Sequence, residues 1–81
     1  MNPYSPYGQR PGYNQRITLQ QAQQIALQAV PGRIMDVDMD LENGVLVYEV
    51  FIMTEQGQIF EVEILARNSR IIKIDQENDY D

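Results

Sequence analysis

Hydrophobic and polar residues alternate strictly along one stretch of the chain. From Met35 to Glu42, apolar side chains at the odd positions are separated by aspartate or glutamate at the even positions. A period of two is that of a β-strand with one apolar and one polar face. Asn43-Gly44 follows directly and is typical of the tight type I′ turn of a β-hairpin. The pattern therefore predicts a strand that turns sharply into a second one.

Three further strands are predicted along the rest of the chain. They cover residues 45–53, 58–66 and 70–75. Short loops connect them, and Gly57 suits a left-handed position in the first of these loops. Because the loops are short, neighbouring strands are antiparallel. The expected sheet is a four-stranded antiparallel meander.

The turn lengths also predict which residues lie opposite each other. One apolar row crosses all four strands and consists of Val37, Val50, Val62 and Ile74. The same register predicts the flanking pairs Met35–Ile52, Ile64–Ile72 and Leu65–Ile71.

An amphipathic helix is predicted at residues 17–30, before the sheet, with its apolar residues on one face at helical spacing. Thr18 and Gln21 have the spacing of a capping box at its start, and Pro31-Gly32 ends it. This helix is the element available to cover the apolar face of the sheet. The predicted fold class is therefore α+β, with one N-terminal helix packed on one face of a four-stranded antiparallel β-meander.

Composition divides the 81 residues into three parts. Residues 1–16 hold three of the four prolines and three of the five tyrosines without an apolar period, so a disordered tail or linker is expected there. Residues 17–76 form the predicted domain, and residues 77–81 an acidic tail that frays.

Charge and residue usage exclude several classes of function. The chain has 12 acidic against 6 basic residues, and it has neither Cys nor His. Disulfides, thiolate or histidine catalysis, and ordinary zinc, copper or haem sites are therefore excluded. The acidic balance argues against nucleic acid as a partner. No apolar run has the length of a membrane span, and no signal peptide or anchor is recognisable in this sequence. We predict neither an enzyme nor a cofactor.

The sheet face opposite the helix is the predicted interaction surface, because it combines an acidic middle with apolar borders. Like charges opposite each other destabilise a sheet, so such a face invites a protein partner or a cation. Its candidate residues are Asp36, Asp38, Asp40, Val47, Glu49, Phe51, Glu61, Glu63, Leu65, Ile71 and Lys73. A sheet edge could instead pair with an extended peptide, although the acids of the first strand guard against indiscriminate pairing.

The run Asp36, Asp38, Asp40 superficially suggests a calcium loop. An EF-hand needs Gly at its sixth position and Glu at its twelfth, where this chain has Leu41 and Val47. A flat strand also places these carboxylates about 6.6 Å apart. No metal site is therefore predicted, and weak calcium binding is only the third alternative.

The order of these pieces resembles the PepSY domain family over residues 17–74. The resembling pieces are residues 22–29 of the helix, Pro31-Gly32, Gly44 with Tyr48-Glu49-Val50, and Gly57 with Phe60-Glu61-Val62. At the third turn, Leu65 replaces the family's usual Asp, and Asn68-Ser69 replace its Thr-Gly.

The resemblance implies a non-catalytic module outside the cytoplasm. PepSY domains occur in propeptides of thermolysin-like metallopeptidases and in bacterial cell-envelope proteins, where inhibition or regulation of peptidases has been proposed for them. The implied partner is a protein, with a peptidase as the first candidate. The alternatives are a homodimer formed through the outer face and a spacer within a larger envelope protein.

Overall fold

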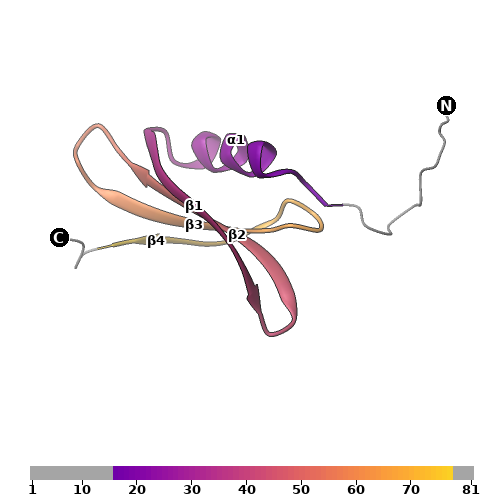
Figure 1. Cartoon of the computed structure of the whole chain (residues 1–81). Coiled ribbons are helices and arrows are strands. Elements are labelled where there is room, and N and C mark those ends of the chain that lie inside the picture. The colour runs from indigo at the N-terminus through magenta and orange to yellow at the C-terminus, as the bar shows by residue number, and fades with distance from the viewer. Residues whose placement is uncertain (1–15, 78–81) are drawn as a thin grey trace, which may run out of the picture.

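The computed structural model describes residues 16–77. In this part of the chain, α1 (Leu19–Ala29) is followed by β1 (Arg33–Glu42), β2 (Val45–Met53), β3 (Ile59–Leu65) and β4 (Ile71–Gln76). The strands form one antiparallel sheet in the order β1-β2-β3-β4, and α1 lies across one face (Figure 1). The predicted fold class is confirmed. Apart from Arg16 and Glu77, both predicted tails lie outside the described residues.

Local sequence signals set the ends of α1. The Gln21 backbone N–H donates to Thr18 Oγ1 at 3.1 Å, and the Thr18 N–H donates to Gln21 Oε1 at 2.8 Å. This is the predicted capping box, which satisfies donors that the first helical turn leaves free. Ala22 and Ala26 are fully buried on the face that packs on the sheet. Their small side chains let the helix backbone approach the strands closely.

The core lies between α1 and the two central strands. Its strand residues include the fully buried Val50, Ile52, Val62 and Ile64. Tyr48 is also buried, and its hydroxyl donates to the Ile17 carbonyl oxygen at 2.9 Å. A buried hydroxyl costs free energy unless it is hydrogen-bonded, so this contact both satisfies Tyr48 and ties the start of the helix to β2.

Two glycines occupy positions that other residues fit poorly. A Cβ on Gly32 would collide with the Met53 carbonyl oxygen, so only glycine lets the chain pass from α1 into β1 so close to β2. In the β1–β2 turn, Asn43 and Gly44 have φ of 53° and 79°. Both values lie in the left-handed region, as the type I′ turn requires.

The predicted register holds across the centre of the sheet and is wrong at one end of β1. Ile34, not Met35, lies opposite Ile52, and the register shifts between Ile34 and Asp36. This β-bulge leaves Met35 as an unpaired extra residue with 40% of its surface exposed. The gain is that Ile34 packs against the core, which a regular alternation would not allow.

A second bulge corrects the predicted pairing of β3 with β4. Ile71, not Ile72, lies opposite Ile64, so the predicted pairs Ile64–Ile72 and Leu65–Ile71 are wrong. In the turn before β4, Ser69 has a left-handed φ of 63°, and its N–H donates to the Leu65 carbonyl oxygen at 3.0 Å. The shift brings Ile71 against the core and leaves Ile72 47% exposed.

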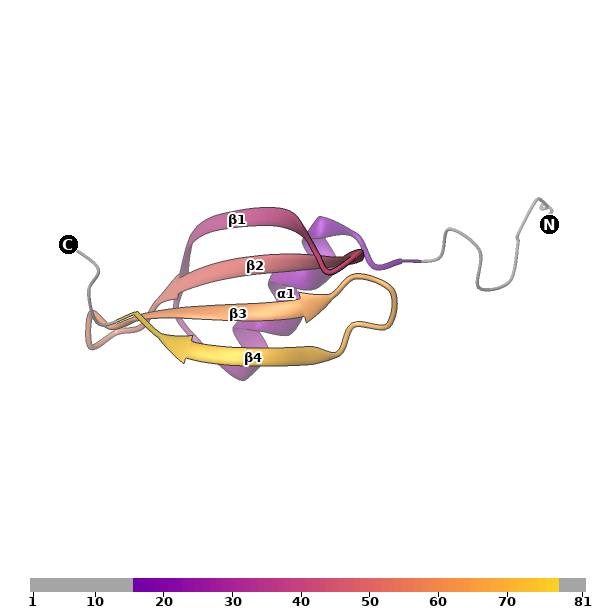
Figure 2. The same ribbon diagram turned by 90° about the horizontal axis from the view of Figure 1, so that it is seen from below.

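The sheet is strongly twisted, and α1 does not cover its whole inner face. The end of the β1–β2 hairpin bends away from the helix (Figure 1). Figure 2 looks onto the opposite face, with α1 behind the strands. Apolar residues of both edge strands therefore remain exposed on or beside the helix side, and Met39 is 49%, Leu41 66% and Ile74 48% exposed.

Candidate functional site

The sheet face opposite α1, called the outer face below, carries all of the candidate residues except Ile71. Cross-strand pairing places Asp38, Glu49, Glu63 and Lys73 in one row from β1 to β4. The neighbouring row holds Asp36, Phe51, Glu61 and Asp75, and the row on the other side holds Asp40, Val47 and Leu65. Ile71 belongs instead to the helix side, because the bulge in β4 turns it toward the core.

The burial of side chains on the outer face differs from what the alternation of apolar and polar residues predicts. Val47, expected as an exposed apolar border, is only 1% exposed, and Glu63 only 6%. Phe51 and Leu65 are half-buried, while Asp36, Asp38 and Asp40 are exposed. The accessible part of the outer face therefore consists of the three aspartates of β1, the half-buried centre around Phe51, and the exposed Lys73 and Asp75 of β4.

One lysine lies among three carboxylates of β3 and β4 on the outer face. Lys73 Nζ lies 3.9 Å from Glu61 Oε1, 3.8 Å from Glu63 Oε2 and 4.0 Å from Asp75 Oδ2. These distances permit attraction but exceed those of charge-assisted hydrogen bonds. The two glutamate side chains are only 12% and 8% exposed. The Glu61 and Glu63 carboxylates, followed by that of Asp75, raise the pKa of Lys73, so it stays charged.

The crowding of acids favours protonation of one of them near neutral pH. Burial, together with a side-chain hydrogen bond to Glu63, raises the pKa of Glu61 to about 7 against the opposing effect of Lys73. The pKa of Glu49 is raised as well, by burial first and then by a hydrogen bond with Glu42 and the charges of Asp40 and Glu63. The outer face therefore holds an anionic network that takes up protons more readily than isolated carboxyl groups do.

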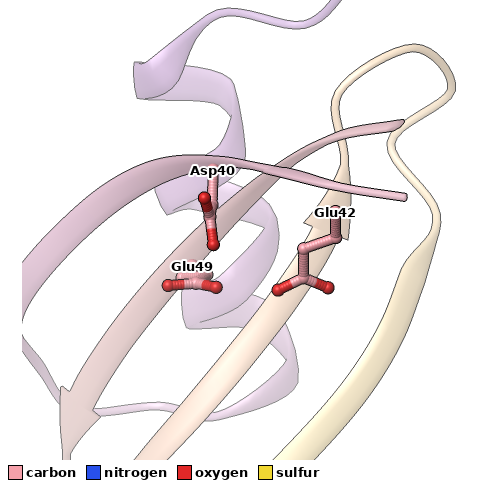
Figure 3. Close-up of side chains that lie close together, drawn as sticks. All are labelled: Asp40, Glu42 and Glu49. Atoms are coloured by element: carbon pink, nitrogen blue, oxygen red, sulfur yellow. The ribbon is translucent and has the colours of Figure 1, made fainter. Parts of the chain in front are cut away.

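Two groups of carboxylates could each offer a cation three oxygen ligands. Asp40, Glu42 and Glu49 form one group, with ligand atoms within 4.8 Å of one another, and they converge at the β1–β2 hairpin (Figure 3). Glu49 also forms a second group with Glu61 and Glu63. Glu42 was not among the candidate residues, although the period of two along β1 already assigns it to this face. The run Asp36, Asp38, Asp40 is not itself one of these groups.

A shallow hollow lies apart from the acidic network. It has a volume of about 950 Å³, and its lining includes Pro31, Arg33, Met53, Glu55 and Phe60. These residues come from the α1–β1 connection, the start of β1, the end of β2, the β2–β3 turn and the start of β3. None of the eleven candidate residues lines it.

Among the described residues, no helix is long and apolar enough to cross a membrane.

The family model described as "Peptidase propeptide and YPEB domain", PepSY, matches residues 16–78. The chain belongs to the PepSY family. This match extends over the helix and all four strands of the domain. The family consists of peptidase-propeptide and regulatory modules that are in general non-catalytic and typical of extracellular or envelope proteins.

The PepSY domain also has a curated relative in Bacillus subtilis (strain 168), the uncharacterized protein YkoJ. The two are 40% identical over 57 residues, which is 70% of this chain and 34% of YkoJ. The chain thus spans about a third of the length of this relative. No solved structure matches the chain.

Proposed function

We propose that this PepSY domain is a non-catalytic, extracytoplasmic protein-interaction module that binds a peptidase through its outer face. The observation that carries the proposal is the buried and half-buried group of Glu49, Glu61 and Glu63, which Lys73 neutralises only in part. Holding carboxylates together on a partly desolvated surface costs folding free energy. A basic surface of a partner offsets that cost on binding, so the arrangement favours a complex over the free domain.

Phe51 adds an apolar anchor to this anionic surface. It lies between Asp36 and Glu61 in the cross-strand row and is only half-buried. Aromatic side chains are enriched at the centres of protein interfaces, where a polar rim surrounds them. The peptidase and the location outside the cytoplasm are taken from the family, whose description names peptidase propeptides.

The test is inhibition of a thermolysin-like metallopeptidase, measured as the initial rate of cleavage of a fluorogenic peptide. The full chain is expected to lower this rate in proportion to its occupancy, and salt should weaken the inhibition because it screens the charges. The double variant Glu49→Gln/Phe51→Ser should inhibit about tenfold less well, which corresponds to about 1.4 kcal/mol of binding free energy.

The matched control is Glu55→Gln, which removes an exposed acid in the β2–β3 turn, away from the outer-face network. This variant should inhibit as the wild type does. An unchanged cleavage rate at a large excess of the domain would contradict the peptidase role. Equal inhibition by the double variant and the wild type would instead contradict the outer face as the contact.

Self-association through the outer face, the alternative function, has less support. Val47 is buried and Ile71 packs against the core, so the apolar borders that two copies would share are smaller than predicted. Two anionic faces also repel each other. Sedimentation velocity should therefore give a monomer at every protein concentration, and a dimer throughout would favour the alternative.

A further inference from the structure

The open edge of β1 presents backbone donors whose direction the hairpin determines. A two-residue turn makes Glu42 and Val45 a hydrogen-bonded pair, and such pairs alternate along an antiparallel hairpin. The N–H and C=O groups of Val37, Met39 and Leu41 therefore point away from β2, toward the open side. Among the described strands, β1 is one of the two edges of the sheet.

Two of these outward donors are covered by neighbouring aspartates. The Val37 N–H donates to Asp36 Oδ1 at 3.0 Å, and the Leu41 N–H donates to Asp40 Oδ1 at 2.9 Å. These bonds are consistent with N–H groups that point away from β2, as the geometry of the hairpin requires. They also occupy the sites that a passing strand would use, which is one way in which a protein protects an edge from indiscriminate pairing.

The two sides of the same edge differ in chemistry. Asp36, Asp38 and Asp40 are exposed on the outer side. On the helix side, Met39 is 49% and Leu41 66% exposed, so apolar area remains uncovered there. A strand laid beside β1 would meet carboxylates on one side and apolar side chains on the other.

We infer that the open edge of β1 binds an extended segment of a partner protein in which basic and apolar residues alternate, and that this segment adds to the sheet as a fifth strand. The inference rests on the proposed function, because it names the kind of segment that the module binds. Lys or Arg side chains of the segment draw the carboxylates of Asp36 and Asp40 away from the backbone. The N–H groups of Val37 and Leu41 are then free to donate to the carbonyl oxygens of the incoming strand. Acidic and neutral segments lack this means of opening the edge.

The other edge is less suited to such a partner. β4 has 6 residues against 10 in β1, and the pairing irregularity between β3 and β4 lies at its start. Its outer side carries Lys73 beside Asp75, so it lacks the unbroken set of acids that would attract a basic segment. From Asp36 to Glu42, the pairing of β1 with β2 is uninterrupted, so a long continuous edge is available there.

The test uses the full chain and a capped decapeptide in which Lys alternates with Val. Fluorescence anisotropy of the labelled peptide is expected to give a dissociation constant in the micromolar range that rises with salt. In the complex, amide hydrogen exchange of Val37, Met39 and Leu41 should slow by about tenfold or more, because these donors become part of the sheet. The same peptide N-methylated throughout should bind about tenfold more weakly or worse.

Variants of the protein test the contribution of charge to binding separately from that of backbone pairing. Asp36→Asn with Asp40→Asn keeps an oxygen that can cover each donor but removes the charge, so binding should weaken about tenfold. Met39→Pro removes an outward N–H without touching the bonds to β2 and should also weaken binding. Glu55→Gln is the matched control and should bind the peptide as the wild type does. If Met39→Pro fails to fold, the N-methylated peptide and the exchange data still decide.

Several results would overturn the inference. These are absence of binding, equal binding of the N-methylated peptide, unchanged exchange at the three amides, and a peptide-free dimer that protects them. The last result would make a second copy the occupant. Peptidase inhibition that depends on Glu49 and Phe51 but not on Met39 would overturn the edge inference and leave the proposed function standing.

Discussion

Glu61 and Glu63 are two residues apart on β3, so their side chains lie on the same face of the sheet. Both are largely removed from solvent, and Lys73 lies just under 4 Å from each. A proton on Glu61 turns the repulsion between the two carboxylates into a hydrogen bond. At the scale of single residues, the outer face is therefore stabilised by proton uptake, which gives it a measurable dependence on pH.

We predict that the domain is more stable at pH 5 than at pH 8. The pKa of Glu61 rises from 4.5 to about 7 on folding, so the folded state binds this proton more tightly than the unfolded chain. Stability must then fall as the pH rises through the window between those two values. The loss is about 1 to 3 kcal/mol, and thermal unfolding followed by circular dichroism at each pH would measure it.

Glu61→Gln is the variant that isolates this effect. Glutamine resembles the protonated glutamate, so the change in melting temperature between pH 5 and pH 8 should become smaller than in the wild type. Glu55 is exposed, so Glu55→Gln should keep the pH dependence of the wild type. A wild-type pH profile in Glu61→Gln would mean that another group carries the proton.

At the scale of elements, the two bulges determine which apolar residues complete the core. A regular alternation through β4 would bury Ile72 and expose Ile71. The structure has the opposite arrangement, because the register shifts between Glu63 and Ile64. A bulge costs a ladder hydrogen bond, and the burial of Ile71 offsets that cost.

We predict that Ile71→Ser destabilises the domain more than Ile72→Ser. Ile71 packs against the core, so its loss should cost about 1 to 2 kcal/mol of unfolding free energy. Ile72 is 47% exposed, and its replacement should cost about 0.5 kcal/mol or less. Urea unfolding of the two variants measures the difference. If Ile72→Ser were instead the more destabilising variant, the result would support the register in which Ile72 lies opposite Ile64.

For the stability of the whole molecule, the positions of the charges matter more than the net charge. The net charge is −6, and residues 36–81 hold all twelve acids. Because β1, β2 and β3 carry many of them on one face, the repulsion is concentrated there rather than spread over the surface. Lys73 is the one base within 4 Å of this network among the described residues.

We predict that Lys73→Glu lowers the melting temperature by several degrees at low salt and by less at high salt. The substitution removes the cation of this network and adds a further acid, while salt screens the resulting repulsion. The wild type should itself become more stable as salt is added, through the same screening. Differential scanning calorimetry across a salt series measures both trends. A salt-independent loss would point to packing of the lysine stem instead.

The sequence predicted most of the fold because its signals are local. Asn43-Gly44 and the period of two along β1 set the hairpin, and Thr18 with Gln21 set the start of α1. It did not predict that Val47 is buried on the outer face. That burial depends on how far the sheet twists and on which neighbouring side chains fold over it, and neither is encoded near Val47 in the sequence.

The sequence by itself therefore determined the elements, their antiparallel order, the centre of the register and the assignment of the acids to one face. Only the tertiary structure decided which carboxylates meet. Glu42 and Glu49 belong to different strands and do not lie opposite each other, yet their carboxylates converge at the hairpin. The physical reason is that alternation specifies a side of the strand, whereas contact between side chains depends on twist, bulges and side-chain reach across the sheet.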